Sequence, residues 1–263
     1  MSDFIVKPSA ADQAFKIDFV PLTTEEYLAG ASHVLSESFL TEPLNWALSV
    51  DYTLMKRFCD LYVVKCMENG LSMVAVSTPL DSPDTKEVVG VVICEDLAAP
   101  VEDDLEYEGC HIVDPIDEIL TLITDDLTEI IQQQRLPPTV QSKEEQQNAA
   151  AEAIPIGKFL RIVLIGIESK WQGMGIGKEL LRRNLKRLSD NSSSSSSFCV
   201  ASAEVASVGS QKLFVNVLGF DVLKDYPYAD FQRPNNPESR PFAVVTSPPS
   251  IQLVARSLSN PLP

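Results

Sequence analysis

The sequence predicts an α/β fold in which strands and helices follow one another along the chain. An apolar run over residues 159–167 passes through a glycine-rich turn into an amphipathic stretch over residues 178–188, which is typical of a strand–turn–helix junction. Helical and alternating apolar patterns also succeed one another on both sides of this junction. The 263 residues, 44% of them hydrophobic, could bury the core of one large domain or two small ones, and we expect a single domain over residues 1–263.

The first elements are a strand and a helix. Residues 16–20 alternate between apolar and polar side chains, as a half-buried strand does. Thr23 and Glu26 have the spacing of a capping box, so we expect a helix that begins there and runs toward Phe39.

A second helix and a hairpin follow. Residues 52–69 repeat apolar side chains at helical spacing, and Asn69-Gly70 is a stop signal. Residues 72–77 and 88–94 have strand patterns on either side of a polar turn that contains Pro and Asp. We therefore expect an antiparallel pair here.

The middle of the chain predicts one long helix and an irregular segment. Apolar residues recur at helical spacing over residues 116–131. Residues 132–153 are rich in Gln, Glu and Ala between Pro137-Pro138 and Pro155, so we expect a flexible excursion on the surface.

The strand expected at residues 159–167 leads into a helix with one apolar face. That face would carry Ile176, Leu180, Leu181, Leu185 and Leu188, while Arg182, Arg183, Lys186 and Arg187 would face water. Residues 190–197 contain six consecutive serines and predict a flexible loop.

The remaining elements complete the alternation. Residues 198–205 predict a strand, residues 210–218 a helix ended by Gly219, and residues 220–223 a further strand. Residues 242–246 and 251–256 would supply the last strand or strands.

The turn between residues 172 and 177 is the feature that most directly predicts function. Gly173, Gly175 and Gly177 let the backbone approach a polyanion without obstruction by Cβ atoms, and the N-terminus of the following helix supplies N–H donors and positive potential. The spacing G-x-G-x-G matches neither the dinucleotide fingerprint G-x-G-x-x-G nor the P-loop. The chemistry therefore indicates a phosphate-containing ligand.

The turn resembles the acetyl-CoA signature Q/R-x-x-G-x-G/A of the GNAT N-acetyltransferases, matched here by Gln172, Gly175 and Gly177. The resemblance implies a mixed, mostly antiparallel sheet that splays at its central strand, and acetyl-CoA as the co-substrate. It also implies that the end of the central strand pairs with the pantetheine arm, that amides near Gly166 and Ile167 polarise the thioester carbonyl, and that the turn holds the pyrophosphate. The cofactor-binding residues would be Ile165, Gly166, Ile167, Gln172, Gly173, Met174, Gly175, Ile176, Gly177 and Lys178.

Two shorter matches are similar to the insect-type arylalkylamine or dopamine N-acetyltransferases. They are Phe39-Leu40-Thr41-Glu42-Pro43-Leu44-Asn45 and Tyr228-Ala229-Asp230-Phe231 ahead of Pro248-Pro249. The resemblance implies direct acetyl transfer to a small primary amine, with Glu42 as the base. An amine of pKa about 10 is protonated at neutral pH and needs such a base before it can attack a thioester. A Glu that merely ends a helix before Pro43 is the structural alternative.

One departure from the family pattern concerns the leaving thiolate. Many GNAT enzymes place a Tyr four residues before the Gly of a terminal Gly-Phe pair as general acid, and this chain has Val215 there. A thiol of pKa about 8.5 leaves tolerably without an acid. The insect-type enzymes use serines near the start of this helix, which makes Ser207 and Ser210 candidates for a catalytic role or for a helix cap.

Composition limits the partners, the location and the cofactors that we expect for this protein. The net charge of −16 disfavours non-specific binding to nucleic acid and would attract cationic amines. The sequence contains no run of about 20 apolar residues and no signal-peptide pattern at its start, so we expect a cytoplasmic protein without a membrane partner. His33, His111 and five scattered cysteines do not suggest a metal site. Acetylation of a peptide amine, and a non-catalytic acyl-CoA-binding regulator, are the alternatives to a small-amine acetyltransferase.

Overall fold

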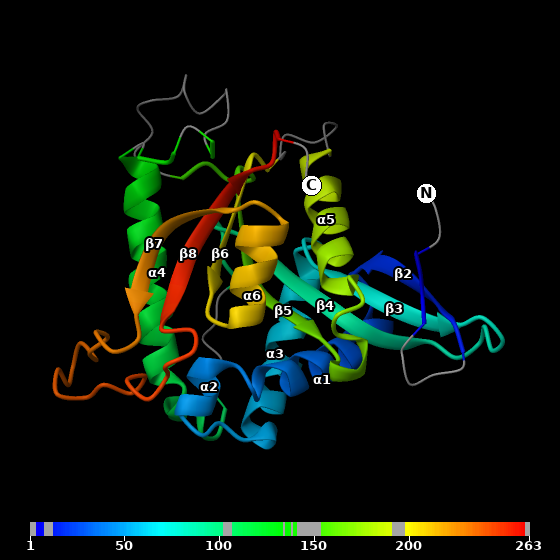
Figure 1. Cartoon of the computed structure of the whole chain (residues 1–263), viewed down its shortest axis with the longest axis horizontal. Coiled ribbons are helices and arrows are strands. Elements are labelled where there is room, and N and C mark those ends of the chain that lie inside the picture. Colours follow the sequence, from blue (N-terminus) through cyan, green and yellow to red (C-terminus); the bar gives the residue numbers. More distant parts are fainter. Residues whose placement is uncertain are drawn as a thin grey trace.

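One mixed sheet organises the computed structural model, which describes residues 4–7, 13–101, 107–133, 135–137, 139–140, 154–190 and 198–260 (Figure 1). Along the chain the elements are β1 (Phe4–Val6), β2 (Phe15–Pro21), η1 (Glu25–Tyr27), α1 (Leu28–Phe39), α2 (Pro43–Ala47), α3 (Tyr52–Glu68), β3 (Met73–Pro79), β4 (Glu87–Asp96), η2 (Cys110–Ile112), α4 (Asp114–Gln132), β5 (Phe159–Ile167), η3 (Ser169–Trp171), α5 (Ile176–Ser189), β6 (Val200–Val205), α6 (Val208–Gln211), η4 (Lys212–Val217), β7 (Asp221–Pro227) and β8 (Ser250–Ser257).

The strands lie in the order β1-β2-β3-β4-β5-β6-β8-β7. Every neighbouring pair is antiparallel except β5 and β6, which are parallel. A parallel pair needs a crossover, and α5 provides it on one face of the sheet. The expected mixed, mostly antiparallel sheet flanked by helices is therefore confirmed.

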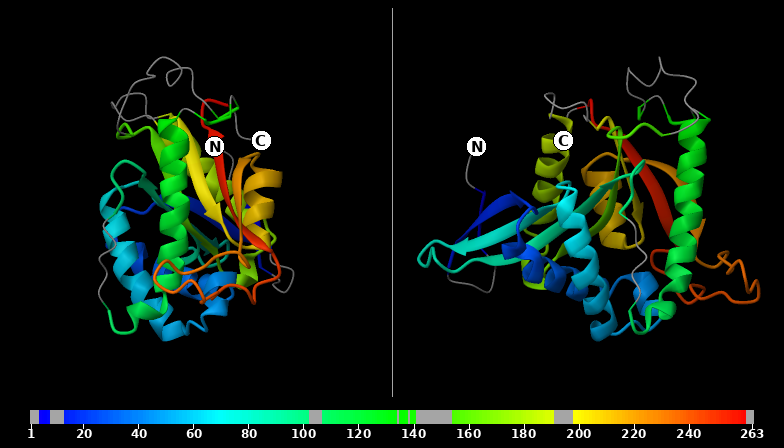
Figure 2. Two further views of the ribbon diagram at one scale, coloured as in Figure 1. Left: turned by 90° about the vertical axis from the view of Figure 1, so that its left-hand side faces the viewer. Right: turned by 180° about the vertical axis from the view of Figure 1, so that it is seen from behind.

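Alternation along the strands gives the sheet two apolar faces. On one face, Leu181 and Leu185 of α5 pack in a cluster with Ala201 and Val254. On the opposite face, α1 and α3 cover Val74, Val91 and Ile93, while α4 covers Leu253 and Ala255 further along the sheet. The side view in Figure 2 shows α3 and α6 on opposite sides of the sheet.

Two expectations near the N-terminus need correction. Thr23 and Glu26 form no capping box; a 3-10 turn at Glu25–Tyr27 precedes α1, and the Thr24 side chain makes no cap hydrogen bond. Leu22 is buried and donates its N–H to the Ser72 carbonyl at 3.0 Å. This hydrogen bond continues the pairing of β2 with the chain before β3 by one residue, and the first helix begins later than expected.

The arginines on α5 also differ from expectation, because two of them do not simply face water. The Arg183 guanidinium lies 4.5 Å from the centre of the Phe19 ring. Arg187 donates to the carbonyl of Gly70 at 3.1 Å and to Oδ1 of Asn184 at 2.9 Å. Arg183 therefore attaches the helix to β2, and Arg187 attaches it to the turn between α3 and β3.

The last strand prediction is half right. Residues 251–256 lie within β8, whereas residues 242–246 form no strand. Phe242 is buried against Tyr228 and Phe231, so its apolar character serves a loop packed on the sheet edge. Most of residues 132–153 and 190–197 lie outside the described residues. None of the described helices is long and apolar enough to span a membrane.

Candidate active site

A cavity lies where the parallel strands β5 and β6 separate. The two strands pair only over residues 159–162 and 200–203, after which β5 continues to Ile167 while paired with β4 alone. A bulge in the β4–β5 pair leaves Val163 without a partner at the point of separation. The cavity at this fork has a volume of about 1000 Å³ and is lined from both halves of the sheet.

The glycine-rich turn between β5 and α5 has the backbone that its sequence predicts. Gly173 and Gly175 have φ values of +78° and +80°, a left-handed conformation that favours glycine, and Gly175 is the N-cap of α5. Among the described residues, no amide from Gly173 to Lys178 donates to a backbone carbonyl. The turn therefore presents several N–H donors beside the positive end of a helix.

The end of β5 directs its backbone groups to both sides. Glu168 donates its N–H to the Val89 carbonyl at 3.0 Å, and strand alternation then turns the backbone groups of Gly166 toward β4 as well. Those of Ile165 and Ile167 face the open fork. Of the two amides expected near a thioester carbonyl, that of Ile167 thus faces the fork and that of Gly166 faces β4.

Gln172 and Ser38 close the corner between this strand and α1. Gln172 Nε2 donates to the Ile167 carbonyl at 3.0 Å, and Ser38 Oγ donates to the same oxygen at 3.4 Å. A Cβ atom at Gly166 would lie 2.9 Å from Ser38 Oγ. The glycine is therefore needed for α1 to pack directly on β5.

The other predicted cofactor residues present backbone rather than side chain. Ile176 is buried in the core cluster beneath α5, and Met174 packs against the same cluster. Gly177 and Lys178 are half-buried in the first turn of the helix. At these positions the side chains belong to the core or to the helix surface, and the amides are the groups without a backbone acceptor among the described residues.

Glu42 is the N-cap of the short helix α2 and lines the cavity. Its Oε2 accepts hydrogen bonds from the Leu44 amide at 2.9 Å, the Asn45 amide at 3.1 Å and the Asn45 side-chain Nδ2 at 3.1 Å. Its Oε1 is buried and accepts no hydrogen bond from the part of the chain that the structure describes. One oxygen thus fixes the carboxylate and the other remains available.

Burial raises the pKa of Glu42 to about 7, against the lowering effect of the hydrogen bonds from Asn45 and Leu44. A carboxylate that titrates near neutral pH is suited to accept and return a proton at that pH. The helix α2 and the role of Asn45 were not predicted. The sequence signal for this helix was Glu42 followed by Pro43, because Pro is favoured at the first position of a helix, directly after the N-cap residue.

Ser207 and Ser210 form a capping box at the start of α6. The Ser210 amide donates to Ser207 Oγ at 3.1 Å, and the Ser207 amide donates to Ser210 Oγ at 3.0 Å. Both serines also line the cavity. The structure thus shows the cap role and leaves both hydroxyls beside the fork.

Val215 does not line the cavity. The helix after α6 contains a π turn over Lys212–Val217, which shifts the side chains relative to a regular α-helix. Leu213 and Phe214 face the cavity, whereas Val215 packs against the core beneath α5. The position that spacing assigned to a general acid is therefore displaced from the site.

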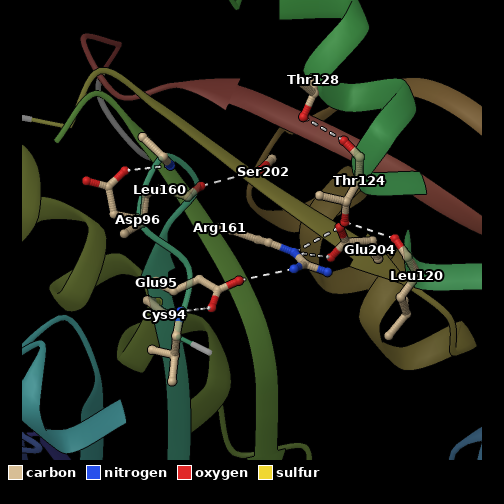
Figure 3. Close-up of polar contacts among 12 residues, drawn as sticks. Cys94, Glu95, Asp96, Leu120, Thr124, Thr128, Leu160, Arg161, Ser202 and Glu204 are labelled. Carbon is tan, nitrogen blue, oxygen red and sulfur yellow. Dashed lines mark hydrogen bonds and ion pairs between the residues drawn. The ribbon is translucent and has the colours of Figure 1, made fainter. Parts of the chain in front are cut away.

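A buried ionic network at the fork was missed by sequence reasoning. Arg161 of β5 pairs through Nη1 with Glu95 Oε1 of β4 at 3.0 Å and through Nε with Glu204 Oε1 of β6 at 3.1 Å (Figure 3). Glu95 Oε2 also accepts from the Val101 amide at 3.1 Å. The signal was a single charge inside the apolar patterns of β5 and β6, and acidic residues at the end of the apolar run of β4.

The helix α4 also contributes to the wall of the cavity. Ile116, Leu120 and Thr124 line the cavity, while Ile119 and Ile123 are buried in the core. Phe39 also lines the cavity, whereas Trp46 does not and is 60% exposed. Among the described residues, no three His, Cys, Asp or Glu side chains are grouped to hold a metal ion.

No protein-family model and no curated protein sequence matches this chain. Solved structures of similar fold include the C-terminal condensation domain of Ebony in complex with beta-alanyl-dopamine, with a TM-score of 0.67 and 15% identity over 92% of this chain and 99% of that one. Arylalkylamine N-acetyltransferase 2 from Aedes aegypti gives a TM-score of 0.58 and 17% identity over 92% of this chain and 99% of that one. An agmatine N-acetyltransferase gives a TM-score of 0.59 and 16% identity over 92% of this chain and 99% of that one. The chain therefore has the fold of the GNAT N-acetyltransferases.

Proposed function

We propose that this protein is an acetyl-CoA-dependent N-acetyltransferase that transfers the acetyl group directly to a small primary amine, an arylalkylamine or a related compound. The observation that carries the proposal is the carboxylate of Glu42, a residue that lines the cavity at the fork: Oε2 is fixed by hydrogen bonds, and the buried Oε1 has no hydrogen-bond partner among the described residues. Proteins of the same fold include an arylalkylamine N-acetyltransferase and an agmatine N-acetyltransferase.

The cofactor side of the site fits a pyrophosphate and an acyl-pantetheine arm. The unpaired amides from Gly173 to Lys178 would hold the phosphates, and the open edge of β5 at Ile165 and Ile167 would pair with the arm. When bound, acetyl-CoA supplies an activated thioester. The Ile167 amide would donate to the thioester carbonyl as negative charge develops on its oxygen.

Glu42 would provide the base. In its deprotonated form, Oε1 accepts one proton from the substrate ammonium, directly or through a water molecule. The amine nitrogen then forms the C–N bond with the carbonyl carbon, the C–S bond breaks, and the second ammonium proton leaves with the thiolate. Ser207 or Ser210 would deliver that proton, since both hydroxyls line the cavity. No covalent enzyme intermediate is required, because the site holds both reactants together.

The test is a release assay for free thiol with acetyl-CoA and a panel of arylalkylamines, alkylamines, polyamines and peptides. We expect thiol release with small primary amines and none with tertiary amines, which cannot form a stable amide. Release with peptides alone would favour a peptide acetyltransferase. Binding of acetyl-CoA in calorimetry without release for any amine would favour a non-catalytic regulator.

A further inference from the structure

The buried network of Arg161, Glu95 and Glu204 has more negative than positive charge. It contains two carboxylates and one guanidinium, and the side chains of Glu95 and Glu204 are only 3% and 4% exposed. No other described cationic side chain pairs with either carboxylate. A buried charge without compensation is costly, so the arrangement calls for another positive partner.

All three side chains line the same cavity as Glu42. The charged residues of the described lining are Arg161 and five acidic residues, Glu42, Glu95, Asp117, Asp125 and Glu204, so acidic groups predominate there. Glu42 Oε1 has no partner among the described residues and would accept from the nitrogen that reacts. An ammonium group bound at Glu42 would compensate the charge of Glu42 only, so the network of Glu95, Arg161 and Glu204 would keep its excess negative charge.

Glu204 retains acceptor capacity. A carboxylate offers about four lone-pair sites, and Arg161 Nε occupies one on each oxygen of Glu204, at 3.1 Å and 3.3 Å. A ligand cation could therefore approach from the cavity side without displacing Arg161. Figure 3 shows Arg161 reaching from β5 to Glu204 on β6, with Thr124 of α4 on the same side of the sheet.

We propose that this network binds a second cationic group of the acceptor, so that the preferred substrate is a diamine whose first nitrogen reacts at Glu42 and whose second lies at Glu204. The inference rests on the proposed function for its reaction, but it makes a separate claim about binding. A diamine would neutralise the network and Glu42 together, whereas a monoamine would leave the network unbalanced.

The experiment compares matched acceptors that differ only in the second nitrogen: putrescine against butylamine, and cadaverine against pentylamine. Binding is measured by calorimetry in the presence of CoA, and turnover by thiol release with acetyl-CoA. We expect each diamine to bind at least about tenfold more tightly than its monoamine, a difference of about 1.4 kcal/mol.

Glu204→Gln is the test variant. It leaves Arg161 paired with Glu95 in a balanced network, so the fold should persist, and the preference for diamines should be largely lost. Glu129→Gln is the control, because it removes one negative charge from an exposed position that does not line the cavity. Glu95→Gln serves the same purpose as Glu204→Gln if that variant proves unstable in a melting experiment.

The outcomes separate the two claims. Equal binding of diamine and monoamine to the parent protein, or a preference that persists in both Gln variants, would overturn the inference whether or not the protein is an enzyme. Tight, Glu204-dependent binding of diamines without thiol release would uphold the second-cation site and reject the proposed acetyl transfer. Turnover of monoamines and diamines at the same kcat/KM would uphold acetyl transfer and reject the site.

Discussion

The carboxylate of Glu42 performs two tasks at once. Oε2 caps α2 through two amides and the Asn45 side chain, which prevents the group from rotating away, and Oε1 stays free of partners within the described chain. Desolvation by burial would by itself favour the protonated acid, and the three donors oppose it. The balance holds the pKa of Glu42 at about 7 rather than far above neutrality.

Glu42→Gln should lower kcat/KM for a primary amine by roughly 10²-fold at neutral pH. The amide oxygen can still cap α2, so the affinity for acetyl-CoA should be unchanged. In the parent, kcat/KM should fall as the pH drops below about 7, because Glu42 must be deprotonated to accept a proton. The variant should lack this limb, and its defect should shrink at high pH, where free amine is abundant. Steady-state rates across pH provide the measurement.

The matched control is Glu37→Gln, an exposed carboxylate on α1, which should behave as the parent does. A defect of Glu42→Gln that stays constant up to the pKa of the amine would assign Glu42 a positional role instead.

Asn45→Ala should move the same limb to higher pH. Asn45 Nδ2 donates to Glu42 Oε2 at 3.1 Å and so favours the charged form; its loss raises the pKa of Glu42 further. The pH profile of kcat/KM is the readout, with the melting temperature measured beside it. A lower melting temperature with an unmoved limb would show that Asn45 only supports packing.

At the scale of elements, we expect the turn before α5 to bind the phosphates of acetyl-CoA. Gly175→Val should weaken acetyl-CoA binding at least about tenfold, or 1.4 kcal/mol, because a branched side chain would obstruct the approach to the amides. Calorimetry on the folded variant decides the matter. Gly70→Val is the control, since Gly70 also has a positive φ, at +65°, and open space around it, but lies outside the cavity. Equal affinity in both variants and the parent would reject the phosphate site.

Local patterns predicted most of these elements because period and turn chemistry act over short distances. The strand at residues 159–167 has the predicted bounds, and α3, α4 and α5 lie within two or three residues of theirs. The errors arose where a distant contact prevailed. Phe242 packs under a loop instead of joining the sheet, and Leu22 pairs with Ser72 before the first helix can begin.

In the candidate site, too, features made by one continuous segment could be predicted from the sequence, and features that need distant segments could not. The turn from Gln172 to Gly177 could be found from spacing, because one continuous segment makes it. The network of Glu95, Arg161 and Glu204 could not, since three strands far apart in sequence must align before the charges meet. Val215 was misplaced because a π turn cannot be inferred from a count of residues.

For the whole molecule, the excess of 37 acidic over 21 basic residues gives a net charge of −16. The field of such a protein attracts cationic amines and is screened over about 8 Å at physiological salt. KM for an amine should therefore rise several-fold between low and high ionic strength. KM for the anionic acetyl-CoA should not rise in parallel. Initial rates in a sodium chloride series would check this, and identical salt dependences for both substrates would contradict it.

The two walls of the cavity are attached to different halves of the sheet. Two side chains from the C-terminal part of the chain bind α4: Arg233 Nη2 donates to Glu118 Oε1 at 2.7 Å, and the Tyr226 hydroxyl of β7 donates to Asp126 Oδ2 at 2.6 Å. The helix α1 instead packs on β4 and β5.

Within the sheet these halves are joined by only four residue pairs, between β5 and β6. A small rotation of one half of the sheet about this joint would change the distance between the two walls of the cavity. Each wall would keep its own structure. A change of volume at the joint, such as Ala201→Val beneath α5, would therefore select longer or shorter amines without touching any of them.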